Sequence, residues 1–185
     1  MKSIYKYFSV IFILLFITSC NRKLSHEQAL NYYVNVSMQI REVTILVKSF
    51  TAKLSLLKQD SSSKIKTLQN YESLKSDYYE LVGELDKKTK ILDELAYKKE
   101  NFYLKHSAIN FIKDTRDILV NDVFRLLNIY KPAADKIVKP GLTEMYHFFV
   151  RKDFLITDDR VFKQLSKIYI QQYHLTNGEL VKYKL

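Results

Sequence analysis

Residues 33–57 read YVNVSMQIREVTILVKSFTAKLSLL, and their pattern is the clearest indication of the fold class. Its apolar side chains recur at alternating steps of three and four residues, which places them along one stripe of an α-helix. The stripe consists of Tyr33, Val36, Ile40, Val43, Val47, Phe50, Leu54 and Leu57. The pattern predicts one long helix that must bury this stripe against a partner.

The same spacing returns after a polar interruption at residues 59–63, QDSSS. Serine and aspartate favour a loop that ends in a helix N-cap. Lys88 is the only charged member of the second stripe, and its stem is expected to lie along the seam with its ammonium in water. Two such helices predict an antiparallel hairpin with arms of about 40–50 Å. The second stripe consists of Ile65, Leu68, Tyr71, Leu74, Tyr78, Leu81, Leu85, Lys88, Leu92 and Leu95.

Three further helical segments follow the hairpin. A broad apolar stripe over residues 107–130 predicts a centrally placed helix, which ends at Lys131-Pro132 because proline disfavours helix before itself. Its members are Ala108, Ile109, Ile112, Leu119, Val123, Leu126, Leu127 and Tyr130. A short aromatic helix is expected over residues 142–149, after the turn signal Pro140-Gly141.

A last helix completes the predicted fold. It is expected to begin at a cap on Thr157 or Asp158 and to stop near Asn177-Gly178. Its predicted stripe is Val161, Phe162, Leu165, Ile168 and Gln172. The chain has only 3 Gly and 2 Pro, too few for a strand-and-turn fold. The sequence therefore predicts an all-α protein, a long antiparallel hairpin extended to a four- to five-helix bundle over residues 25–185.

The N-terminal segment, MKSIYKYFSVIFILLFITSCNRK, has a different character. Lys2 and Lys6 precede an uncharged run that ends at Cys20, a pattern typical of a secretory signal peptide. A membrane-spanning anchor is the alternative interpretation. As a helix, residues 7–20 would extend about 21 Å, well short of a hydrocarbon core of ~30 Å. We therefore predict a signal peptide over residues 1–19.

The residues Ile17-Thr18-Ser19-Cys20 resemble the lipobox of bacterial lipoproteins. This resemblance implies that the Cys20 thiol receives a diacylglycerol and that cleavage makes Cys20 the new N-terminus. The alternative is an incidental thiol beside an ordinary cleavage site. Residues 20–24 would then form a tether of roughly 15–20 Å, which keeps Arg22 and Lys23 close to lipid phosphates.

The formal net charge of +10 points to anionic partners. The lysines are scattered and form no dense block, so a solvated basic surface beside an anionic membrane is the simpler interpretation. No nucleic-acid-binding motif appears, and we expect no nucleic-acid partner. The single cysteine leaves no partner for an intrachain disulfide.

The sequence offers little support for an enzyme. Glu144-x-x-His147 has the spacing of the ligand pairs in di-iron helical bundles, but such sites need a second pair and two further glutamates. The sequence contains no second Glu-x-x-His. Asp158-Asp159 suits a helix N-terminus better than catalysis. We expect no enzymatic activity, cofactor or metal, and a metal-dependent enzyme using Glu144 and His147 is the weakest alternative.

Aromatic residues are abundant, with 14 Tyr and 11 Phe but no Trp. Most are expected to pack between helices. In the adjacent pairs Tyr32-Tyr33, Tyr78-Tyr79 and Phe148-Phe149, one ring is expected to face the core and the other to face outward. Residues 145–154, MYHFFVRKDF, combine aromatic with basic residues between turn signals. This segment is the candidate interaction surface, formed by Tyr146, Phe148, Phe149, Arg151 and Lys152.

Residues 25–185 resemble small helical lipoproteins of spirochaetes and Bacteroidetes in length, in lysine-rich composition and in a long hairpin after a short tether. We predict a membrane-anchored lipoprotein of a bacterial envelope, a non-enzymatic interaction or structural module with a protein partner. The acidic residues that mark surface export in Bacteroidetes are absent after Cys20. This favours a periplasm-facing position on the outer membrane, with a surface-exposed ligand-binding lipoprotein as the alternative. The sequence leaves the oligomeric state open.

Overall fold

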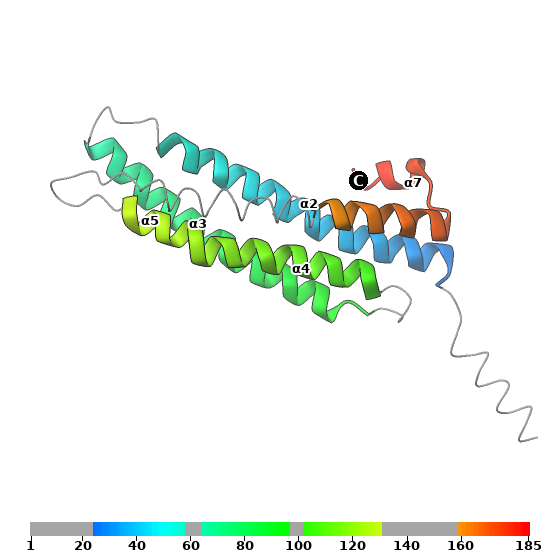
Figure 1. Cartoon of the computed structure of the whole chain (residues 1–185). Coiled ribbons are helices and arrows are strands. Elements are labelled where there is room, and N and C mark those ends of the chain that lie inside the picture. Colours follow the sequence, from blue (N-terminus) through cyan, green and yellow to red (C-terminus); the bar gives the residue numbers. More distant parts are fainter. Residues whose placement is uncertain (1–23, 58–63, 97–101, 131–158) are drawn as a thin grey trace, which may run out of the picture.

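The computed structural model describes residues 24–57, 64–96, 102–130 and 159–185. These residues are mostly helical and contain no strand, which confirms the all-α prediction. Helices α2 (His26–Leu57) and α3 (Lys64–Glu94) lie side by side (Figure 1). They run antiparallel, because Lys53 of α2 pairs with Asp77 of α3 while the earlier Glu42 pairs with the later Lys88. The hairpin is confirmed, and its loop at residues 59–63 lies outside the described residues.

The seam of the hairpin contains the predicted stripes. All of their members whose side chains are described are buried or half-buried, and Val36, Val43, Leu85 and Leu92 are fully inaccessible. The expectation for Lys88 was right for its stem, which lies in the seam, and wrong for its ammonium. Its side chain is only 12% exposed and its ammonium pairs with Glu42 across the seam. At this depth an ammonium without a carboxylate partner would lose much of its hydration.

The third helical segment comprises α4 (Phe102–Ile118), η2 (Leu119–Val123) and α5 (Phe124–Tyr130). Helix α4 packs on both α2 and α3, which confirms the central position. The predicted start at residue 107 was wrong, because the helix already begins at Phe102. Leu104 and Lys105 are buried there, and Lys105 Nζ donates to the carbonyl oxygens of Asp93 (2.7 Å) and Leu95 (3.0 Å) at the end of α3.

The π-helical turn η2 follows from the spacing of the buried residues. Phe111, Thr115, Leu119, Val123 and Leu127 are all buried and stand four residues apart. In an α-helix of 3.6 residues per turn, such a stripe drifts around the axis by about 40° at each step. The Phe124 N–H donates to the carbonyl of Leu119, five residues earlier. This wider turn keeps the last members of the stripe on the buried face.

A fourth helix, over residues 159–173, packs beside the first half of α2 (Figure 1). The predicted stripe was wrong at Val161, Ile168 and Gln172, which are exposed. Phe162 and Leu165 belong to the buried face together with residues that the prediction missed, and Tyr169 and Tyr173 are the largest of these. Tyrosine rings bury more surface than valine or isoleucine, and they set the orientation of the helix. The proposed caps at Thr157 and Asp158 lie outside the described residues.

The predicted stop at Asn177-Gly178 was also wrong. The helix ends at Tyr173, where His174 adopts a left-handed φ of 54° and the Leu175 N–H donates to the Ile170 carbonyl (3.0 Å). Thr176 then caps a new helix, α7 (Asn177–Val181), in a reciprocal capping box with Glu179. The short helix expected over residues 142–149 lies outside the described residues.

Candidate functional site

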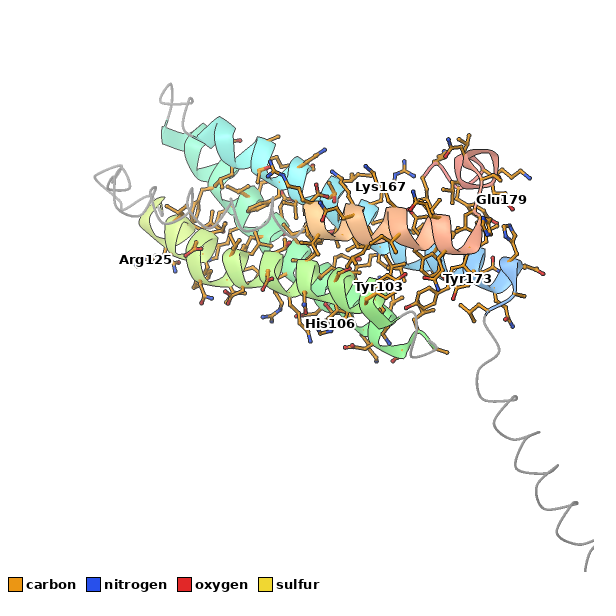
Figure 2. All side chains as sticks on the ribbon, turned by 45° about the vertical axis from the view of Figure 1, so that its right-hand side comes forward. Tyr103, His106, Arg125, Lys167, Tyr173 and Glu179 are labelled. Atoms are coloured by element: carbon orange, nitrogen blue, oxygen red, sulfur yellow. The ribbon has the colours of Figure 1, made fainter. Side chains whose placement is uncertain are left out.

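The site residues that the sequence singled out lie outside the described residues. They are Cys20, Glu144, Tyr146, His147, Phe148, Phe149, Arg151 and Lys152. The described residues instead present two contrasting ends of the bundle. We call residues 25–33, 103–105 and 169–185 the near end and residues 50–54, 71–79 and 120–127 the far end. In Figure 2, Tyr173 and Glu179 mark the near end and Arg125 lies at the far end.

A tyrosine cluster fills the near end. The fully buried ring of Tyr169 stacks on Tyr32 and on Tyr33, each at 5.9 Å between ring centroids, and lies 4.7 Å from Tyr173. The Tyr169 hydroxyl donates to the Ala29 carbonyl (3.2 Å). Burial raises the pKa of Tyr169, so that its phenol stays neutral. Nearby, the Tyr103 hydroxyl donates to Gln172 Oε1 (3.2 Å).

The outcome for the adjacent aromatic pairs differs between the ends. Tyr32 and Tyr33 are both buried, so the expectation that one faces outward was wrong. The helix of residues 159–173 covers the side of α2 that was expected to face solvent. Tyr78 is buried and Tyr79 is exposed, as expected. The pair Phe148-Phe149 lies outside the described residues.

A histidine–carboxylate pair links the two chain segments that meet at the near end. His26 Nε2 lies 2.7 Å from Glu179 Oε1, and His26 Nδ1 lies 3.0 Å from the Tyr173 carbonyl oxygen. Both partners are acceptors, so the protonated ring can donate from both nitrogens, whereas a neutral ring could donate from only one. The hydrogen bond to Glu179 and that to the Tyr173 carbonyl raise the pKa of His26. Hydrogen bonds from His26 and Thr176 lower the pKa of Glu179 to about 2. The pair fastens α7 to the first turn of α2.

The start of α2 has a capping box of its own. The Gln28 N–H donates to Ser25 Oγ (3.3 Å), and the Ser25 N–H donates to Gln28 Oε1 (3.1 Å). This arrangement satisfies two backbone donors that the first helical turn leaves without intrahelical partners. The helix therefore begins at a defined residue, and Leu24 is the last described residue before it.

The far end is aromatic too, but more open. The buried Tyr78 ring lies 5.6 Å from Phe124, 6.5 Å from Phe50 and 5.2 Å from Tyr79. Tyr79 is 54% exposed and Phe124 is 36% exposed. Val120, in the π-helical turn, is exposed as well. These three side chains provide apolar surface that a partner could contact.

Polar groups near the far end pair with one another. Arg116 approaches Asp86 through Nε–Oδ1 (2.5 Å) and Nη2–Oδ2 (3.2 Å), and this contact raises the pKa of Arg116. An open groove of about 200 Å³ lies between α2 and α3, and Lys53 and Asp77 in its lining form an ion pair (2.7 Å). Within the four described ranges, no group of three or more His, Cys, Asp or Glu could hold a metal ion.

Sequence reasoning missed the histidine–carboxylate pair and the tyrosine cluster. Local signals existed for part of this arrangement. Ser25-x-x-Gln28 and Thr176-x-x-Glu179 both have the spacing of a capping box, and the second argues against a helix stop at Asn177-Gly178. The contact between His26 and Glu179 joins residues 153 positions apart, and nothing in the local pattern of either segment indicates it.

No protein-family model matches the chain, and neither a curated protein nor a solved structure matches it.

Proposed function

We propose that the protein is a bacterial lipoprotein, anchored through acyl chains on Cys20, whose helical bundle acts as a non-enzymatic interaction or structural module at the cell envelope. The observation that carries the proposal is the lipobox-like Ile17-Thr18-Ser19-Cys20 at the end of a short apolar run with a basic start. Acyl chains contribute ~0.8 kcal/mol per buried methylene, and two or more hold a protein durably.

The described residues are consistent with a short tether. Helix α2 begins at His26 with its cap at Ser25, only a few residues after Cys20. That segment spans about 17 Å when fully extended, so an anchored bundle would stay close to the bilayer. In the part of the chain that the structure describes, no helix has the length and apolar character needed to cross a membrane.

A binding role, rather than catalysis, is supported by how the charged groups are used. His26, Glu179 and Arg116 have shifted pKa values, and each lies in a pair that joins two helices. Among the described residues, these pairs hold neighbouring helices together, which is a structural use of a shifted pKa. The proposed partner is a protein, with Tyr146, Phe148, Phe149, Arg151 and Lys152 as the proposed contact surface.

The far end supports the alternative of a surface-exposed ligand-binding lipoprotein. The exposed rings of Tyr79 and Phe124 lie opposite the later part of α2, since Tyr78 between them contacts Phe50. Phe50 is about 36 Å along α2 from His26. An anchored protein would direct this aromatic surface away from the tether. Protease treatment of intact cells separates the alternatives, because only a surface-exposed bundle would be cleaved.

The test of the proposal is metabolic labelling with radioactive palmitate. We expect the wild-type protein to carry label and to fractionate with membranes, whereas Cys20→Ser carries none. The matched control is Ser19→Ala, which leaves the thiol in place and should keep the label. An unlabelled wild-type protein would contradict the proposal. Stoichiometric metal in the purified protein, lost in Glu144→Gln and His147→Gln, would instead favour the metal-dependent enzyme.

A further inference from the structure

The chain after Thr176 folds into a compact tip with two different faces. Leu180 is buried and Leu185 packs against the core. The four residues between them, Val181, Lys182, Tyr183 and Lys184, are exposed. We call these four residues the tip face. Valine and tyrosine alternate with lysine over these positions, so the exposed surface of the tip carries both apolar and cationic groups.

Backbone hydrogen bonds hold the tip face in place. The Tyr183 N–H donates to the Leu180 carbonyl (3.0 Å), and the Leu185 N–H donates to the same carbonyl (3.2 Å). Lys184 adopts a left-handed φ of 57°, which closes α7 in the manner of a Schellman turn. The exposure of Val181 (67%) and Tyr183 (39%) therefore belongs to a hydrogen-bonded turn.

The tip lies where the chain would enter the membrane. The 2.7 Å contact between His26 Nε2 and Glu179 Oε1 joins α7 to the first turn of α2. Figure 1 shows α7 at the same end of the bundle as the start of α2. From Ser25 back to Cys20 the chain reaches about 17 Å at most. An acylated Cys20 therefore keeps the tip face within reach of the lipid headgroups.

The chemistry of the tip face suits that position. Tyrosine prefers the interfacial region, where its ring is in apolar surroundings and its hydroxyl is in water. A lysine near an anionic leaflet raises the equilibrium constant for contact with the membrane about fivefold. This attraction is weak alone, but a tether converts it into an intramolecular contact at high effective concentration. Four side chains cover far less than the roughly 800 Å² per partner of a stable protein interface.

We propose that Val181, Lys182, Tyr183 and Lys184 form a second contact with the bilayer, on anionic phospholipid headgroups. This inference rests on the proposed function, because it needs the lipid anchor at Cys20. Two points of attachment fix the orientation of the bundle, with the near end against the membrane and the far end pointing away from it.

The test uses the full chain carrying Val181→Cys, extracted from membranes, labelled with an environment-sensitive fluorophore on the thiol and reconstituted into vesicles. The matched control is Tyr79→Cys, another exposed site but at the far end. The vesicles contain a nitroxide-labelled lipid and either phosphatidylcholine alone or phosphatidylcholine with phosphatidylglycerol. We expect the label at 181 to be quenched and blue-shifted with phosphatidylglycerol, and the label at 79 to report water in both.

A charge variant sharpens the test. In the Val181→Cys chain, Lys182→Gln with Lys184→Gln should lower the ratio of contacting to free tip by roughly 25-fold, about fivefold per lysine. Lys48→Gln with Lys113→Gln removes the same charge from exposed sites on α2 and α4 and should change nothing. Quenching that ignores phosphatidylglycerol and the two tip lysines would overturn the anionic-lipid contact.

Label stoichiometry separates the two proposals. Cys20 is the only natural cysteine, so among Val181→Cys chains whose intact mass shows that Cys20 is retained, an acylated chain takes one fluorophore and a chain with a free Cys20 thiol takes two. One fluorophore with an unquenched label at 181 refutes the tip contact and leaves the lipid anchor standing. Two fluorophores refute the anchor, and the tip contact that depends on it falls as well.

Discussion

The two ends of the bundle use aromatic residues in opposite ways. At the near end, Tyr169 is enclosed by Tyr32, Tyr33 and Tyr173, and the His26–Glu179 pair fastens α7 to the first turn of α2. At the far end, the rings around Tyr78 are partly open to solvent. Aromatic residues therefore stabilise the packing of helices at one end of the bundle, whereas at the other end some of them remain exposed and available for contact with a partner. The proposed anchor at Cys20 precedes the near end by only a few residues in the sequence.

The largest expected effect comes from opening the near end. Tyr169→Ala removes a fully buried ring and should lower the free energy of unfolding by about 3–5 kcal/mol. Tyr169→Phe keeps the ring and loses only the hydrogen bond to the Ala29 carbonyl, so it should cost about 1 kcal/mol. Urea denaturation followed by circular dichroism measures both.

The far-end counterpart is Tyr79→Ala, at a ring that is mostly exposed. Surface substitutions of this kind usually change stability by about 0.5 kcal/mol or less. If Tyr79→Ala lowered the free energy of unfolding as much as Tyr169→Ala does, the proposed difference between the two ends would be wrong.

The second effect concerns the seam between the two ends. Glu42→Gln leaves the Lys88 ammonium without its carboxylate in a partly buried position and should cost about 1–2 kcal/mol. Lys88→Leu removes the charge and restores the apolar stripe, so it should be neutral or stabilising. Thermal unfolding of both single variants and of the double variant measures these changes in stability. Equal losses for Glu42→Gln and Lys88→Leu would show that the ion pair itself supplies net stability.

The third effect is a small gain in stability in the helix of residues 159–173. Ser166 is buried and its hydroxyl makes no hydrogen bond in the structure. Ser166→Ala should therefore stabilise the protein by about 0.5–1 kcal/mol. Ser107→Ala is the matched control, since the Ser107 hydroxyl donates to the Leu104 carbonyl (3.0 Å) and its loss offsets the gain in helix propensity. Chemical denaturation should thus rank Ser166→Ala above wild type and above the control.

The smallest effect is a pH dependence of the near end. Because the pKa of His26 is raised, the contribution of its charge to stability is complete below the ordinary pKa of 6.5. That contribution is lost as the pH rises through the folded-state pKa. The pKa of Glu179 is lowered from 4.5 to about 2, so the contribution of its charge to stability is complete above pH 4.5 and is lost as the pH falls toward 2. The melting temperature of wild type minus that of His26→Gln should peak between pH 4.5 and pH 6.5. A difference that stays constant up to pH 9 would show that His26 acts without its charge.

The hairpin could be predicted from the sequence because it depends on local periodicity. Every step of the stripes in α2 and α3 is three or four residues, and a single helix can satisfy that pattern in one way only. The orientation of the helix over residues 159–173 could not be predicted in this way. Its apolar residues lie on more than one side, and the contacts of Tyr169 with Tyr32 and Tyr33 select which side is buried.

The features of the candidate sites also fall into those that follow from local sequence and those that depend on contacts between distant segments. Short linear patterns such as Thr176-x-x-Glu179 carry their own physical reason and could be found in the sequence. The pairs of His26 with Glu179 and of Arg116 with Asp86 depend on which helices become neighbours. The sequence also identified Cys20 as a candidate anchor, and that prediction rests on covalent chemistry that the fold does not determine.

The most direct test of the account is the intact mass of the full-length gene product, extracted from the membranes of cells that express it. We expect a chain that begins at Cys20 and carries the added mass of diacylglycerol, with or without an acyl group on its new amine. A chain that retains residues 1–19, or one that begins at an unmodified Cys20, would contradict it.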